Sequence, residues 1–219
     1  QPLQVGTRNI AVLQIKTHKV YAVKMGSGAV ETAASAQALL TRVKCDMAFS
    51  VGPVGALSDK LKIGSWHRVG EAVNYQKGSW TKSGFQLSPS STSSLPTNSA
   101  EKFKLPELFQ RLDAIKVASG EIFIASDDYR SQLRETTSAD AVDMNLFGLI
   151  AVCADHRLAL TCWRIASDKA DDNASEDFRK FVSSYDGAGG KATAELIANL
   201  PANPNSPTSY PNLNRALSR

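Results

Sequence analysis

The fold is decided by one stretch of the chain, residues 10–55, which reads IAVLQIKTHKVYAVKMGSGAVETAASAQALLTRVKCDMAFSVGPVG. Two apolar, β-branched runs at 10–16 and 19–25 are separated by a Thr-His pair, which predicts a β-hairpin. An Ala- and Leu-rich segment with helical periodicity follows at 29–43. A short apolar run at 46–51 then predicts another strand. Because strands and a helix alternate in this order, the stretch indicates an α/β layered fold.

The alternation of strands and helices continues along the chain. Predicted strands cover residues 61–76, 114–119, a short segment ending at Val142, and 158–165. Predicted helices cover residues 105–113, 127–135, 146–155, 174–184 and 190–199. We find no internal repeat, and we therefore expect a single domain over residues 1–200.

Two segments depart from this pattern. Residues 86–101 form a Ser- and Pro-rich segment, whose run SPSSTSSLPTNS at 88–99 is almost devoid of core-forming side chains. This composition predicts a long exposed loop or a disordered insertion. Residues 201–219 are rich in Pro, Asn and Ser, which predicts a C-terminal surface extension.

The composition excludes several classes of protein. With 219 residues, of which 42% are hydrophobic, the chain can bury a sizeable core, so disorder and coiled coil are excluded for the whole chain. Its 25 Lys and Arg against 21 Asp and Glu give a net charge of +4, and the basic residues are scattered. We therefore expect no nucleic-acid partner. No run approaches the roughly 20 apolar residues of a membrane span, so we expect no membrane partner.

The cysteines and histidines give no sign of a metal or cofactor. Cys45, Cys153 and Cys162 are an odd number without C-x-x-C spacing, which predicts reduced core residues. The three histidines are widely separated and lack the spacing of metal ligands. The sequence therefore predicts no metal and no cofactor.

Two glycine-containing segments lie where strands end, which is where ligands bind in open α/β sheets. Gly26, Ser27 and Gly28 precede a predicted helix, where free backbone N–H groups favour an anion such as phosphate. The alternative is a tight turn that needs glycine. The segment 52–55, GPVG, either lets the backbone approach a ligand closely or forms a plain β-turn.

Two polar segments are further candidates. Residues 143–145, DMN, place polar side chains around a thioether at a predicted strand-to-helix junction, and they equally fit a helix cap. Arg164, Ser167 and Asp168 leave an apolar strand, so the carboxylate would lie at a pocket mouth, where burial raises its pKa toward general-acid use. The alternative is a helix N-cap with a solvated acidic turn.

These residues resemble the purine nucleoside phosphorylase superfamily, and within it the nucleosidases that cleave methylthioadenosine and S-adenosylhomocysteine. The resemblance spans about residues 10–185. It rests on MGSGAV (25–30), SVGPVGAL (50–57), LKIG (61–64), GEIFIAS (120–126), ADAVDMN (139–145) and RIASDKADD (164–172). The family fold it implies is a three-layer α/β sandwich with a central mixed β-sheet flanked by helices, of the phosphorylase/hydrolase type.

The resemblance also implies roles for individual residues. Asp168 matches the acid that protonates N7 of the purine, and Ser167 matches the residue that orients it. Arg164 matches an arginine near the attacking water or phosphate. The residues expected at the substrate are Phe123 (stacked on the base), Ile124 (backbone at the base edge), Met144 (under the ribose), Asp143, Asn145, Val54 and Gly55.

The sequence departs from the family at three points. Asn145 stands where the family has a glutamate that grips the ribose hydroxyls, and Pro53 stands where the nucleosidases have a serine that helps hold water. The first family strand, which carries a glutamate base in nucleosidases, would lie before Gln1. The sequence therefore leaves open a divergent, storage-like member that binds a nucleoside with little or no catalysis.

The main hypothesis is an enzyme that cleaves the N-glycosidic bond of a purine nucleoside. It would be a nucleosidase, or a nucleoside phosphorylase with inorganic phosphate as co-substrate. The resemblance also implies a homo-oligomer, a dimer or larger. A chain that begins at Gln1 without methionine is compatible with a cytoplasmic location and with export after signal cleavage.

Overall fold

The computed structural model describes residues 3–96 and 112–200. Its strands are β1 (Leu3–Val5), β2 (Arg8–Ile15), β3 (His18–Val23), β4 (Met47–Ala56), β5 (Trp66–Asn74), β6 (Gly78–Thr81), β7 (Gly84–Leu87), β8 (Thr92–Ser94), β9 (Ala114–Ser119), β10 (Ala141–Asp143) and β11 (Ala159–Asp168). Its helices are α1 (Ala29–Leu40), the short 3-10 helix η1 (Pro89–Ser91), α3 (Asp127–Thr137), α4 (Leu146–Asp155), α5 (Ala174–Ser184) and α6 (Ala188–Ala198).

The main sheet is mixed and closes on itself. Among the described residues, its strand order is β11, β4, β10, β9, β5, β8. β4 runs parallel to β11 and antiparallel to β10, whereas β9 runs parallel to both β10 and β5. β11 also pairs antiparallel with β5, residues 163–165 lying opposite residues 66–68. The sheet therefore curls until its first strand meets its fifth, instead of staying open.

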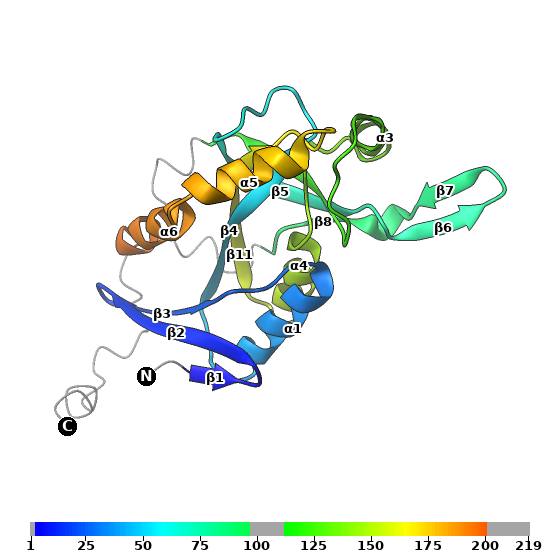
Figure 1. Ribbon diagram of the computed structural model, residues 1–219. Helices are drawn as coiled ribbons and strands as arrows, with labels where there is room; N and C mark the ends of the chain where they lie inside the picture. Colours follow the sequence, from blue (N-terminus) through cyan, green and yellow to red (C-terminus); the bar gives the residue numbers. More distant parts are fainter. Residues whose placement is uncertain (1–2, 97–111, 201–219) are drawn as a thin grey trace.

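Helices cover both faces of β11, because successive side chains of a strand point to opposite sides. Leu160, Cys162 and Ala166 belong to the core cluster that also contains residues of α4. Trp163, one position out of phase, packs instead with Leu196 of α6. Figure 1 shows α5 and α6 on one side of β4 and β11, with α4 and α1 on the other. This arrangement confirms the predicted mixed sheet flanked by helices.

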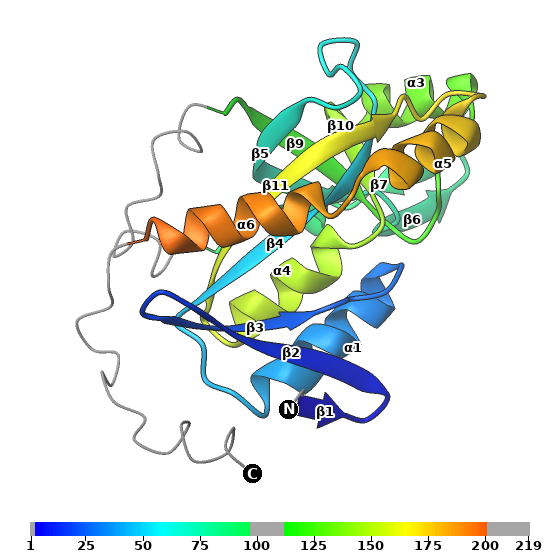
Figure 2. The ribbon, with the colours of Figure 1, turned by 60° about the vertical axis from the view of Figure 1, so that its left-hand side comes forward.

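The N-terminal strands form a separate layer. Residues of β2 and β3 pair as the predicted hairpin, and β1 adds to β2. Figure 2 shows this small sheet in front of α1 and α4. Arg8 Nε donates to Ser35 Oγ at 2.6 Å, which joins β2 to α1. The helix predicted at 29–43 is confirmed as α1, which ends at Leu40.

The GPVG segment at 52–55 is not a turn, which corrects the sequence prediction. β4 continues through it to Ala56 and pairs with β11 along its length. Among the described residues, β10 pairs with β4 only at Gly55 and Ala56, and no strand pairs with Pro53 on that edge. A proline, which lacks an N–H, is tolerated in a strand at such an edge.

The Ser-rich segment is also more ordered than its composition predicted. Ser88 Oγ accepts the N–H of Ser90 and caps η1, and the short strand β8 then pairs with β5. Ser91 is 1% exposed and Leu95 8% exposed, so one face of the segment is buried. Serine hydroxyls can supply the hydrogen bonds that a loop backbone needs, which composition alone does not reveal. The remainder of the segment, the helix predicted at 105–113 up to residue 111, and the tail at 201–219 lie outside the described residues.

Most other predicted elements agree with the structure in kind, but the strand predicted at 61–76 is shorter, since β5 covers only Trp66–Asn74, and residues 112–113 of the predicted helix are not helical. β9, α3, α4, α5 and α6 lie at the predicted positions, and β11 extends three residues beyond Ile165, through Ser167 and Asp168. Within the described ranges, no helix has the length and apolar character needed to cross a membrane.

Candidate functional site

A buried carboxyl group lies at the end of β11. Asp168 is 1% exposed, and its Oδ1 accepts the N–H of Ala170 at 2.9 Å. Burial raises the pKa of Asp168, and the nearby negative charges of Asp177 and Asp171 add to the rise, whereas hydrogen bonds from Ser167 and Ala170 oppose it. A raised pKa favours the protonated form of the Asp168 carboxyl group.

The hydrogen bonds around this acid also suit its protonated form. Ser167 Oγ lies 2.7 Å from Asp168 Oδ2 and 3.1 Å from the carbonyl oxygen of Val54. A hydroxyl has one hydrogen, so Ser167 cannot donate to both oxygens at once. When Asp168 carries a proton on Oδ2, it donates to Ser167, which then donates to Val54. The arrangement can therefore hold a proton at the end of the strand.

Gly55 makes room for the acid. It lies beside Asp168 in the pairing of β4 with β11. A Cβ at this position would stand 2.9 Å from Asp168 Oδ1 and 3.1 Å from the Cβ of Ala170. The glycine in this strand is thus explained by the close approach of Asp168.

Arg164 lies in a buried ion pair rather than on an open surface. Its Nε and Nη2 donate to Asp143 Oδ2 at 3.1 and 3.0 Å, and its Nη1 donates to the Oγ of Ser50 and to the carbonyl oxygen of Trp163. Both side chains of the pair are almost fully buried. The guanidinium that the resemblance places near water or phosphate is therefore committed to Asp143.

Asp143 in turn begins helix α4. Its Oδ1 accepts the N–H groups of Asn145 and Leu146 at 3.2 and 3.1 Å. Together with the two bonds from Arg164, these fill the four acceptor positions of a carboxylate. Asp143 thus bonds the N–H groups of the N-cap residue, Asn145, and of the first helical residue, Leu146, which is close to the capping interpretation of 143–145.

Met144 and Asn145 are half-buried and contact the glycine turn before α1. Asn145 Nδ2 donates to the carbonyl oxygen of Gly26 at 2.8 Å. Ser27 Oγ lies 3.8 Å from the sulfur of Met144. The structure thus brings together two segments that the sequence reading singled out separately, because α1 and α4 pack side by side.

Two N–H groups at the turn before α1 and in its first turn have carboxylate partners. Glu31 Oε2 accepts the N–H of Ser27 at 3.3 Å, and Glu121 Oε1 accepts the N–H of Val30 at 3.1 Å. A helix N-terminus attracts negative charge, and here two side chains supply it. The turn at 26–28 therefore has the tight, glycine-dependent geometry of the alternative reading, with acidic groups where phosphate was expected.

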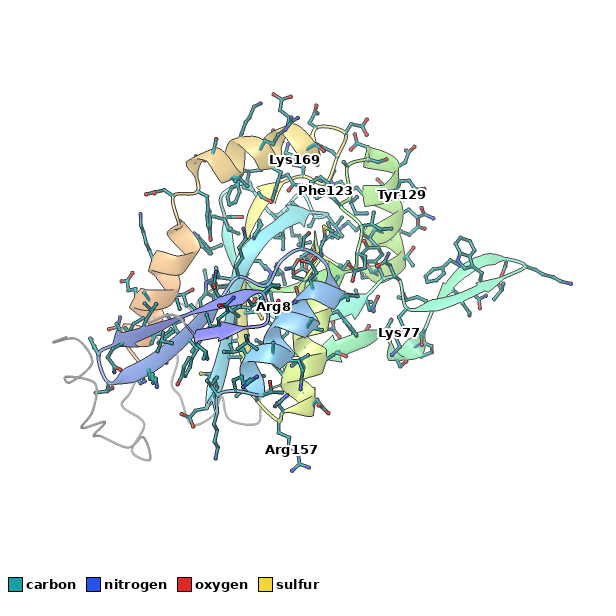
Figure 3. All side chains as sticks on the ribbon, turned by 60° about the horizontal axis from the view of Figure 1, so that its bottom comes forward. Arg8, Lys77, Phe123, Tyr129, Arg157 and Lys169 are labelled. Atoms are coloured by element: carbon teal, nitrogen blue, oxygen red, sulfur yellow. The ribbon has the colours of Figure 1, made fainter. Side chains whose placement is uncertain are left out.

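An aromatic pair lies near the end of β11. Phe123 is 41% exposed, and its ring meets that of Phe178 from α5 edge to face, with centroids 5.7 Å apart. Figure 3 shows Phe123 at the same end of the molecule as Lys169, the residue after Asp168. The neighbouring Ile124 buries its side chain, and neither its N–H nor its C=O bonds to another described residue.

The sequence reading missed two of these residues. Glu121 lies inside the GEIFIAS segment, but only Phe123 and Ile124 of that segment were considered. Phe178 was treated as part of a helix, although its spacing from Phe181 marks an apolar face. That spacing could have marked Phe178, whereas Glu121 carries no sequence signal, because its contact with Val30 comes from a distant segment.

The remaining reactive groups are inert or structural. Burial raises the pKa of Cys153 to about 11 and that of Cys162 to about 12, so both thiols stay protonated at neutral pH. Cys45, also free, has a pKa raised by burial. In residues 3–96 and 112–200, no group of three or more His, Cys, Asp or Glu side chains is placed to hold a metal ion.

The sequence matches the family model of the phosphorylase superfamily over residues 3–198. A 5′-methylthioadenosine/S-adenosylhomocysteine nucleosidase of Staphylococcus aureus is 25% identical over 195 residues, which cover 85% of this chain and 84% of that protein.

Solved structures share the fold. The 5′-methylthioadenosine/S-adenosylhomocysteine nucleosidase of Helicobacter pylori with butyl-thio-DADMe-Immucillin-A aligns with a TM-score of 0.77 at 18% identity, covering 90% of this chain and 87% of that one. Futalosine hydrolase of the same organism aligns with a TM-score of 0.71 at 17% identity, covering 90% of this chain and 85% of that one. At such identities the matches establish the fold, which is the one expected from the sequence.

Proposed function

Because the chain belongs to the phosphorylase superfamily, we propose that it cleaves the N-glycosidic bond of a purine nucleoside, with Asp168 as the acid that protonates N7 of the leaving base. The observation that carries the proposal is the buried position of Asp168, whose pKa is raised by burial. A carboxyl group whose pKa is raised keeps its proton to a higher pH, which suits it to act as a general acid.

The groups around Asp168 support the same reaction. Phe123 offers an exposed aromatic face for a flat base, and Phe178 holds its edge. The backbone groups of Ile124 can bond the base edge, and Met144 offers an apolar contact for the sugar. Arg164 acts here as a positioning residue, because its ion pair fixes Asp143 and through it the start of α4.

We propose water rather than phosphate as the nucleophile. Glu31 and Glu121 accept the N–H groups of Ser27 and Val30 at the α1 turn, and their negative charges would repel a phosphate there. The names of the similar proteins support water as the nucleophile, since they are a nucleosidase and a hydrolase. Their names also make methylthioadenosine and S-adenosylhomocysteine the first substrates to test.

The expected result is release of adenine from one or both of these nucleosides at a rate that inorganic phosphate does not change. Base release is measured by chromatography with and without phosphate, and adenosine and inosine are assayed in parallel. A rate that rises in proportion to phosphate would contradict the hydrolytic assignment. Tight binding of the nucleoside by calorimetry with no base release would instead favour the storage-like alternative.

We further propose that the chain forms a homodimer or larger assembly through the arm made by β6 and β7. In the part of the chain that the structure describes, these two strands pair only with each other, and Figure 1 shows the arm projecting from the body. Trp80 on this arm is 83% exposed and stacks edge to face on Phe85. A large exposed tryptophan is typical of a binding hot spot.

For this assembly we expect light scattering to give the mass of at least two chains for the wild type. Trp80→Ser should shift the mass toward that of one chain at the same concentration. Val182→Ser, which removes an exposed apolar side chain from α5, is the matched control and should leave the mass unchanged. Equal masses for wild type and Trp80→Ser would rule out the arm as the contact.

A further inference from the structure

Glu121 connects two segments that are far apart in the sequence. Its Oε1 accepts the N–H of Val30 in the first turn of α1 at 3.1 Å. Its Oε2 lies against Gly28, so close that a Cβ at that position would overlap it. Gly28 also has a φ of 99°, which favours glycine. The carboxylate is therefore seated on the turn before α1.

The other side of this turn contacts the residues placed at the sugar. Asn145 Nδ2 donates to the carbonyl oxygen of Gly26, and Ser27 Oγ approaches the sulfur of Met144. One short turn thus has Glu121 on one side and Met144 with Asn145 on the other. Any displacement of the turn would move the groups beneath the sugar.

The loop that carries Glu121 is anchored independently of its carboxylate. The backbone N–H of Glu121 donates to Gln76 Oε1 at 2.6 Å, and Tyr75 donates to the carbonyl oxygen of Ile122 at 3.0 Å. The N–H of Gly120 donates to the carbonyl oxygen of Asp143. Loss of the carboxylate would therefore free the α1 turn while the loop toward Phe123 stays in place.

We infer that Glu121 is a positioning residue. It ties the loop at 120–126, which carries Phe123, to the turn before α1, and so fixes the spacing between the base site and the sugar site. The inference rests on the proposed function, because it takes Phe123 and Met144 as the base and sugar contacts. The tie acts through the oxygen that accepts the Val30 N–H. It should therefore affect ligands that span both sites more than ligands that fill one.

The test compares two ligands by calorimetry in the Asp168→Asn background, where a nucleoside is consumed far more slowly. Glu121→Ala should weaken binding of methylthioadenosine about tenfold, since misplacing contacts by a fraction of an ångström has effects of this order. Binding of free adenine should change less than about twofold, because adenine occupies the base site alone. Glu121→Gln keeps an oxygen acceptor for Val30 and should restore the nucleoside affinity. Glu135→Ala, at an exposed position of α3, is the control.

Two results would overturn the inference. One is an equal loss of affinity for adenine and for the nucleoside, and the other is a Glu121→Gln variant as weak as Glu121→Ala. Failure of the wild type to release any base would instead refute the proposed function, and the ratio of the two affinities would still be measurable.

A second measurement checks the contact itself through thermal unfolding. Gly28→Ala should lower the melting temperature more in the wild type than in Glu121→Ala, since only the wild type has the carboxylate in the way. The strain of a positive φ is common to both backgrounds and cancels in the comparison. Equal shifts in the two backgrounds would show that Glu121 does not sit on the turn, which would also overturn the inference.

Discussion

Replacing Asp168 with asparagine should reduce the rate of base release by about 100-fold to 10,000-fold, the range attributed to a general acid. The amide is nearly the same size as the acid, so its oxygen can still accept the Ala170 N–H. Its nitrogen can donate to Ser167, which then donates to Val54. The variant therefore removes the transferable proton and little else. The matched control is Asp128→Asn, an exposed carboxylate in the first turn of α3.

The same variant should not be less stable than the wild type at pH 7. Burial raises the pKa of folded Asp168 above the value of about 3.9 of an unfolded aspartate. Its neutral form therefore stabilises the fold at low pH, and this contribution is lost as the pH rises through the folded pKa. Asparagine does not ionise and avoids that loss. Between pH 4 and pH 8, the melting temperature of the variant should rise relative to that of the wild type as the pH increases.

The pH profile of catalysis should follow the same group. Base release by the wild type should fall as the pH rises past the raised pKa of Asp168, because the ionised carboxylate has no proton to give. Undiminished base release by Asp168→Asn would remove Asp168 from the mechanism. A loss of the same size in Asp128→Asn would mean that the effect is not specific to the acid.

Replacing Arg164 with methionine should lower the free energy of unfolding by about 3–5 kcal/mol, the cost typical of breaking a buried ion pair from one side. The substitution leaves Asp143 charged and buried, with no cation beside it. It also removes the bonds to Ser50 and to the carbonyl oxygen of Trp163. Urea denaturation measures the change, and the exposed Arg42→Met should change stability by less than about 0.5 kcal/mol.

Neutralising the partner should recover part of that loss. In the double variant with Asp143→Asn, the amide oxygen can still accept the N–H groups that begin α4, and the unpaired buried charge is gone. The two substitutions should therefore be non-additive, with about 1–3 kcal/mol recovered relative to the sum of the single changes. A simple sum, or an Arg164→Met variant as stable as Arg42→Met, would contradict a structural role for the pair.

Much of the fold could be read from the sequence because its signals are local. α4 begins and ends where the apolar periodicity of residues 146–155 does, and α5 likewise occupies the predicted residues 174–184. The position of Asp168 at the end of an apolar strand was also a local signal, since a run of buried residues gives way there to acidic ones.

What the sequence could not supply depends on contacts between distant segments. The pairing of Arg164 with Asp143 arises because β10 and β11 both border β4, a fact of sheet order rather than of spacing. One interpretation of the GPVG segment was a β-turn, yet β4 continues through it, and among the described residues β10 pairs with β4 only at Gly55 and Ala56. Glu121 reaches its partners only because its loop and the start of α1 meet in three dimensions.

The double pairing of β11 has a consequence for the order in which the protein folds. β11 pairs with β4 and with β5, and both of these strands lie far before it in the sequence. Such long-range strand pairing forms slowly, because the entropy cost of closing the long loops comes before the stabilising contacts are made. Helices α1 and α4 can form early, whereas the acid at the tip of β11 is assembled only once this last strand docks. During synthesis the molecule would therefore expose the facing edges of β4 and β5 until β11 emerges, and that interval is when it is most prone to aggregate.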